Sequence, residues 1–224
     1  MLTNRGNRIW GACGIGFVAL FATAVALLNV GAPTGSTVSD KEIVSFITDH
    51  KSALQIGSLV MALAGLAFLV FLHGLPERVG GESRMLVPVV AGGLFIGTMF
   101  AYAATGSVLA EALDYEKPFS IDPNTARVLA AISYGGLLYA SIPAAVLIGT
   151  ASAAATRSGA LPRWLTRAGY AGAALCVVTT VVGFPVVPIV MALWVLGVTI
   201  SGGLRNARAD RTSVASGAVA TGRA

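Results

Sequence analysis

Charged residues are scarce in this 224-residue chain: they make up 11% of it, against 55% hydrophobic residues and a mean hydropathy of +0.79. A water-soluble domain carries about a quarter charged residues. The composition therefore excludes a water-soluble globule, and with it a disordered chain, a collagen-like repeat and a coiled coil. Most of the chain has lipid as its solvent, and the expected fold class is an all-α integral membrane protein.

Cysteine is almost absent as well. Cys13 and Cys176 are the two cysteines of the chain, and each falls inside an apolar stretch. This pattern excludes a disulfide framework and a cysteine-rich metal site. We expect both residues to be buried thiols.

Long apolar segments without ionisable groups at their centres dominate the rest of the sequence. A membrane-spanning helix needs about 20 mainly apolar residues. Six segments qualify: Ile9–Val30, Ala53–Leu72, Met85–Ala110, Val128–Ala155, Leu165–Gly183 and Val186–Leu204. We predict a six-helix transmembrane bundle over residues 9–204. The last two segments are short and separated only by a turn at Gly183 to Pro185, which leaves open whether this hairpin spans fully.

The positions of the cations predict the orientation of the bundle. Cytoplasmic loops are enriched in Lys and Arg. With both termini cytoplasmic, eleven of the fifteen cations lie inside, and the exterior holds only Lys41, Lys51, Lys117 and Arg127. Residues 1–8 are then a cytoplasmic N-terminus and residues 205–224 a disordered, basic cytoplasmic tail. Because the cations form short clusters between apolar segments, we expect no nucleic-acid partner despite a pI of 9.6.

The first exterior loop contains a helix-start signal. Ser39 and Glu42 have the capping-box spacing, and Ile43, Phe46 and Ile47 follow as an apolar side. This predicts a short amphipathic outer helix that lies on the membrane surface or extends the second membrane helix. Such a helix is a structural cap or a cover over an outer cavity.

Uncharged polar residues recur on two predicted membrane helices. Tyr102 and Thr105 share one face of the third helix, and Tyr134 and Ser141 share one face of the fourth. One interpretation is an outward-facing cavity for a neutral or lipid-like ligand, which makes these four residues the candidate binding site. The alternative is hydrogen bonding between helices.

Catalytic and metal-binding patterns are missing. His50, His73 and the outer carboxylates form no recognisable constellation, so we expect no catalytic residue, no metal and no cofactor. The lack of charge at membrane depth also argues against a proton-coupled pump or a voltage sensor. Trp10 and Trp164 fall at predicted inner boundaries, where indole rings act as anchors. Pro143 predicts a kink in the fourth helix.

Several short motifs resemble a known group of proteins. They are Phe46 to His50, then Phe71, Leu72 and Leu75, and above all the segment Arg157 to Leu165. With these motifs the chain resembles uncharacterised small bacterial multi-pass membrane proteins of the domain-of-unknown-function type, over roughly residues 8–204. The resemblance implies a six-helix bundle and transfers no catalytic or binding residue.

The expected function is a non-enzymatic binding, accessory or regulatory role in the bacterial cytoplasmic (plasma) membrane; the heavy use of Ala, Gly, Val and Arg favours a bacterial source. The alternative is a transporter or permease for a small uncharged solute. Expected partners are the lipid bilayer and, through small-xxx-small pairs such as Gly93 with Gly97, a second copy or another membrane protein.

Overall fold

The computed structural model describes residues 2–29, 39–79, 85–111 and 123–203, and within these ranges the chain forms helices and no strand. The order is α1 (Leu2–Asn29), α2 (Asp40–Asp49), α3 (Lys51–Val79), α4 (Leu86–Glu111), α5 (Pro123–Tyr139), α6 (Ser141–Ser158) and α7 (Arg163–Val182). A last helix follows over Val187–Gly203. The predicted tail at 205–224 lies outside the described residues.

Five helical segments are long and apolar enough to cross a membrane, so the chain is a multi-pass membrane protein. They are Ile9–Asn29, Lys51–Val79, Leu86–Val108, Asn124–Ser158 and Arg163–Val182. The fourth combines α5 and α6, while the last helix is shorter than the usual spanning length.

Three predicted boundaries differ from the structure. Helix α1 begins at Leu2 and not at Ile9, so the segment predicted as a separate N-terminus is largely part of the helix. Helix α3 continues past Leu72 to Val79, with Pro76 in its last turn. The predicted fourth helix divides into α5 and α6 at Ala140, one turn before Pro143. Because proline has no N–H, it leaves the carbonyl of Tyr139 without its helical donor.

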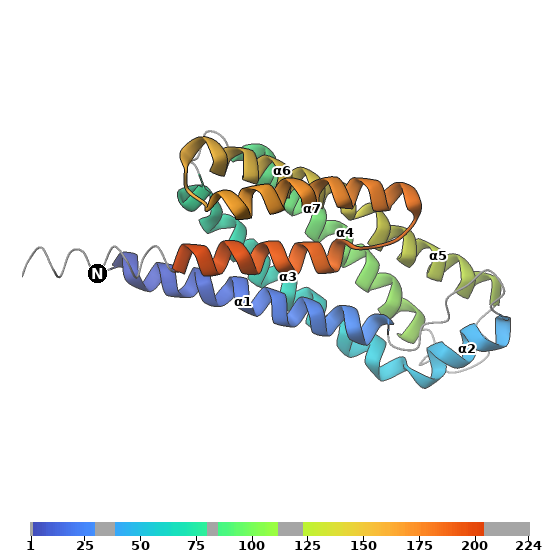
Figure 1. Cartoon of the computed structure of the whole chain (residues 1–224). Helices are drawn as coiled ribbons and strands as arrows, with labels where there is room; N and C mark the ends of the chain where they lie inside the picture. The colour runs from blue at the N-terminus through green and yellow to red at the C-terminus, as the bar shows by residue number, and fades with distance from the viewer. Residues whose placement is uncertain (1, 30–38, 80–84, 112–122, 204–224) are drawn as a thin grey trace, which may run out of the picture.

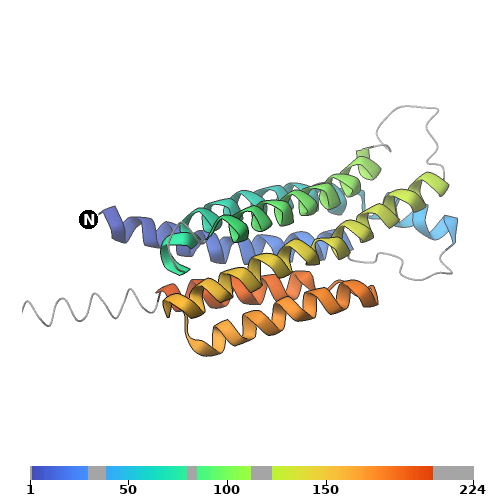
Figure 2. The same ribbon diagram turned by 90° about the horizontal axis from the view of Figure 1, so that it is seen from above.

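The helices form a bundle in which neighbours along the chain also pack together. Helix α1 lies along α3, α3 along α4, and α6 contacts both α4 and α7. Figure 2 shows α6 between the α3–α4 pair and α7. The last helix lies between α1 and α7 (Figure 1). Its contact with α1 is close, because a Cβ added at Gly14 would overlap the hydroxyl of Thr199.

A cluster of phenylalanine rings joins α1, α3 and α4. Phe17 and Phe21 of α1 stack at 5.1 Å between ring centroids, and Phe17 lies 4.6 Å from Phe68 of α3. Phe68 in turn meets Phe95 of α4 at 5.7 Å. All four side chains are fully buried. In a bilayer, helices associate through such packing, because lipid tails are as apolar as the side chains.

Trp10 joins α1 to α3 at the other end of these helices. Its indole Nε1 donates a hydrogen bond of 2.8 Å to the Phe71 carbonyl, and its ring stacks on Phe71 at 5.1 Å. The guanidinium of Arg78 lies 4.2 Å from the ring centroid, in cation–π geometry. Trp10 is 5% exposed, so its indole packs between α1 and α3; its expected role as an anchor at the membrane boundary stays a prediction. Trp164, by contrast, is 64% exposed.

Helix α2 begins with the predicted capping box. The Ser39 hydroxyl accepts a hydrogen bond from the Glu42 backbone N–H, and the Glu42 carboxylate accepts one of 2.8 Å from the Ser39 N–H. Ile43 and Ile47 are buried, and α2 contacts α5 most extensively. The short helix and its capping box are present as predicted, and the helix packs against one end of the bundle; its position outside the membrane stays a prediction.

The capping box predicts a pH-dependent start of α2. Hydrogen bonds from the Ser39 backbone and then from its hydroxyl lower the pKa of Glu42 below 4.5. This stabilisation is complete above the pKa that Glu42 has in the unfolded chain, and it is lost as the pH falls through the lower folded-state pKa. We expect the hydrogen-exchange protection of residues 40–43, corrected for intrinsic rates, to fall in that pH range. Glu42→Gln should remove the pH dependence; equal dependence in both proteins would contradict this assignment.

Candidate functional site

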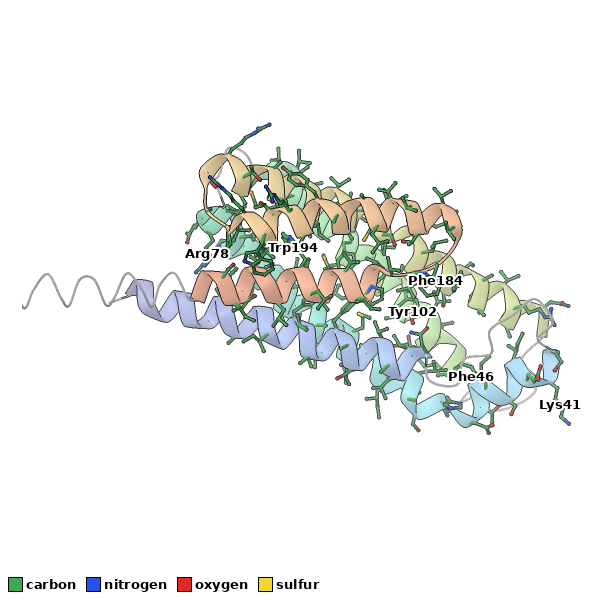
Figure 3. The ribbon with its side chains drawn as sticks, in the orientation of Figure 1. Lys41, Phe46, Arg78, Tyr102, Phe184 and Trp194 are labelled. Carbon is green, nitrogen blue, oxygen red and sulfur yellow. The ribbon has the colours of Figure 1, made fainter. Side chains whose placement is uncertain are left out.

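Tyr102, the first candidate residue, is 6% exposed and connects two helices. Its hydroxyl oxygen accepts a hydrogen bond of 2.8 Å from Nδ2 of Asn29, the last residue of α1. Nδ2 also donates to the Val25 carbonyl at 2.7 Å. Tyr102 thus joins α4 to the end of α1 (Figure 3).

Tyr134 makes a second connection, from α5 to the final hairpin. The side chain is 48% exposed, and its hydroxyl donates to the carbonyl of Gly183. Gly183 ends α7 in the left-handed conformation, at φ 80°, a geometry that glycine adopts without strain. The Tyr134 hydroxyl therefore fixes the turn between α7 and the last helix against α5.

The other two candidates differ from the tyrosines. The Thr105 hydroxyl donates to the Ala101 carbonyl of its own helix at 2.8 Å. Ser141 is fully buried, and its hydroxyl has no hydrogen-bond partner in the described part of the chain. Tyr102 and Tyr134 lie at one level, since a Cβ at Gly136 would be 3.6 Å from Tyr102 Cβ. The tyrosines thus lie at a similar height in the bundle and have separate partners, and a ligand-binding role for the four residues stays a prediction.

A third polar connection lies at the level of Tyr102, and the sequence did not lead us to predict it. The Ser58 hydroxyl of α3 donates to the Ala103 carbonyl of α4 at 2.7 Å and to the Leu54 carbonyl at 2.8 Å. A serine inside an otherwise apolar helix was the available signal. We call the three interhelical hydrogen bonds, Asn29 to Tyr102, Ser58 to Ala103 and Tyr134 to Gly183, the polar belt.

The described residues form a pocket, which is a groove between α7 and the last helix. Its volume is about 380 Å³, near the lower end of the range for small-molecule sites. Its walls are almost wholly apolar, and they consist of Ile148, Trp164, Leu165, Ala168, Gly169, Gly172, Val190, Leu193, Trp194, Leu196, Gly197 and Ile200. Because Trp164 and Leu193 are each 64% exposed, the groove opens on the outer surface of the bundle.

Two polar atoms lie unpartnered beside this groove. Trp194 Nε1 and the hydroxyl of Ser152, on α6, are buried without a hydrogen-bond partner among the residues described. Both lie against Gly169: a Cβ added there would overlap the Ser152 hydroxyl and lie 3.3 Å from Trp194 Nε1. Figure 3 shows Trp194 near the end of the bundle that carries Arg78. A buried donor left unpaired costs about 1–3 kcal/mol, so these atoms call for an explanation.

Sequence reasoning also missed Trp194 and Ser152. The available signal was a tryptophan in the middle of an apolar segment, away from the boundaries where Trp10 and Trp164 lie. Buried indole N–H groups usually have an acceptor.

The two histidines lie apart, one at the C-cap of α2 and the other on α3. No group of three His, Cys, Asp or Glu side chains in the described ranges lies close enough to hold a metal ion. The His50 ring stacks on Phe46 at 4.7 Å, and its Nδ1 lies 3.1 Å from the Phe46 carbonyl. His73 is exposed at a distant part of α3.

The polar belt predicts unequal effects of removing hydroxyl groups. Tyr102→Phe should lower the free energy of unfolding by about 0.6–1.7 kcal/mol, the range for interhelical hydrogen bonds in membranes. Thr105→Val is the control and should change it less, because the Thr105 hydroxyl bonds within its own helix. Unfolding in mixed micelles by SDS measures both. A larger loss for Thr105→Val would contradict the assignment.

The contact at Gly169 predicts that two glycine-to-alanine substitutions change the stability in opposite directions. Gly169→Ala should destabilise the protein by about 1–3 kcal/mol, because the added methyl group meets the Ser152 hydroxyl. Gly149→Ala should be neutral or stabilising by up to about 1 kcal/mol, since its Cβ would lie an ordinary 3.5 Å from Ala173 and helix propensity rises. Adding Ser152→Ala should recover part of the Gly169→Ala loss. Equal stability of both single variants would argue against this close packing.

No protein-family model, curated protein or solved structure matches this chain. The resemblance to small bacterial multi-pass membrane proteins therefore stays a prediction. What the chain does is inferred from its own residues.

Proposed function

We propose that this chain is a non-enzymatic binding protein of the bacterial cytoplasmic membrane, which holds an uncharged or lipid-like molecule in the groove between α7 and the last helix. The groove itself carries the proposal. It is apolar, has a volume of about 380 Å³ and includes exposed residues on its rim. A molecule dissolved in the bilayer can enter it without crossing water.

The proposed topology has six spans, with the last helix as the sixth and both termini in the cytoplasm. The last helix has the length of 17 residues, about 25 Å, and it follows α7 after a tight turn. An even number of spans also keeps most cations on one side. Helix α2 then lies outside.

The polar belt supports binding rather than transport. The polar side chains of Asn29, Ser58 and Tyr134 bond to neighbouring helices. A solute path would need some of these groups for the solute. Gly93 and Gly97 of α4 face open space, which leaves a surface for a second copy or for a membrane protein that this chain accompanies.

A pair of leucine substitutions on α7 tests the proposal. Ala168 lines the groove, Ala171 does not, and both are exposed, so Leu fits at either position without a steric conflict. The full chain is purified in mild detergent, and bound small molecules are identified by native mass spectrometry. We expect the wild type and Ala171→Leu to retain a lipid-like molecule that Ala168→Leu loses. Equal retention by all three, or retention by none, would count against the groove; a stoichiometric protein partner in its place would favour an accessory role.

A further inference from the structure

The groove between α7 and the last helix extends over the depth of one bilayer leaflet. Its residues on α7 begin at Trp164, in the first turn, and end at Gly172. Gly172 comes eight residues after Trp164, about 12 Å along the helix, and half of the hydrocarbon core of a bilayer is about 15 Å thick. Val190 of the last helix lies opposite, since a Cβ added at Gly172 would be 3.0 Å from Val190 Cγ1. The groove therefore has the length for an acyl chain of one leaflet.

The groove is open along its side, so a lipid chain can enter it from the bilayer. Trp164 and Ala168 of α7 and Leu193 of the last helix are wall residues that are exposed. Apolar contact with these walls gives little preference for one lipid over another, because the tails of all lipids are equally apolar. Selectivity has to come from polar groups at the membrane surface.

Arg163 and Arg167 supply such groups at the end of the groove where α7 begins. Both are exposed, and each directly precedes an exposed wall residue, Trp164 or Ala168. Being four residues apart, the two arginines share one face of α7, which borders the groove. Exposed arginine and tryptophan residues at a helix start favour the headgroup layer. Side chains on a helix point towards its N-terminus, which directs the side chain of Arg167 to the same layer.

The helices around the groove contain no acid that could neutralise these two arginines. The sequences of α6, α7 and the last helix lack Asp and Glu. Neither arginine forms an ion pair with a described residue; Glu77, on the neighbouring end of α3, lies 3.9 Å from Arg78. Two like charges four residues apart also repel each other. An anion from outside the protein fits this charge, and a phosphate group matches the guanidinium geometry.

We propose that the groove selects an anionic glycerophospholipid: one acyl chain lies between α7 and the last helix, and Arg163 and Arg167 contact the headgroup phosphate. This inference rests on the proposed function and names the class of its ligand. The apolar walls hold the chain, and the arginines supply the preference for a negative headgroup. In the proposed topology this end of α7 is cytoplasmic, and the cytoplasmic leaflet carries anionic lipids.

The test compares two lipids that differ only in the charge of the headgroup. The full-length protein is delipidated in a neutral detergent and titrated with phosphatidylglycerol or with phosphatidylcholine of the same acyl chains. The rise of the unfolding midpoint with lipid concentration gives the apparent affinity. We expect the wild type to bind phosphatidylglycerol about fivefold to twentyfold more tightly, because each arginine near an anionic headgroup contributes about a factor of five. The preference should fall as salt concentration rises, because salt screens exposed charges.

Variants that each remove one charge assign the preference to the two arginines. Arg163→Gln and Arg167→Gln should each lower it by about threefold to fivefold. Lys41→Gln removes one cation at the end of the molecule away from Arg78 (Figure 3) and should leave the preference unchanged. Ala168→Leu fills the groove and keeps both arginines, so it should weaken the binding of both lipids.

Specific results would overturn the inference. Equal affinity of the wild type for the two lipids would do so and would leave the proposed function intact. A preference that Lys41→Gln lowers as much as Arg163→Gln and Arg167→Gln would show attraction by net charge and not by a site. If Ala168→Leu changes neither affinity, the lipid lies outside the groove. If neither lipid stabilises the wild type, the proposed function fails together with the inference.

Discussion

A polar group buried in a bilayer has to find its partner within the protein, because the hydrocarbon offers none. The structure of this chain depends on that constraint. Asn29, Ser58 and Tyr134 each bond a neighbouring helix, and Trp10 does the same at the opposite end. Since helices in lipid gain little from the hydrophobic effect when they associate, these hydrogen bonds and the phenylalanine cluster between them determine which helices are neighbours. Two of the four residues predicted as a binding site, Tyr102 and Tyr134, thus form hydrogen bonds that connect helices.

The polar belt also divides the bundle along its length. Tyr134 meets the hairpin turn eleven residues after α5 begins, so about 16 Å of α5 extends beyond that turn. Helix α2 packs on α5, and Figure 1 shows both beyond the ends of α7 and the last helix. In the proposed topology this overhang is the extracellular part of the protein. The hairpin of α7 and the last helix is then confined to the membrane, and a groove between its helices is reached from lipid.

Composition and periodicity were enough to predict the all-helical membrane fold, the capping box at Ser39 and the turn at Gly183, because each depends on residues close together in sequence. They could not predict that Trp10 is buried, since its environment is formed by Phe71 and Arg78, more than sixty residues away. The same limit applies to Ser152 and Trp194, which meet at Gly169 only after three helices have packed. Helix ends were also misjudged where polar residues continue a helix beyond its apolar part, as at Leu2 and Val79.

The unpaired N–H of Trp194 is an exception to the pairing of buried polar groups in this bundle. The rest of the described chain connects its membrane-buried polar side chains with few exceptions, which are the hydroxyls of Ser141 and Ser152 and this indole. A phenylalanine would leave no unpaired donor, but it would also leave empty part of the space that the buried indole fills. The Trp194 N–H and the Ser152 hydroxyl both lie against Gly169, where the lack of a side chain lets α6, α7 and the last helix approach closely, so close packing is kept at this point although two polar atoms stay unpaired.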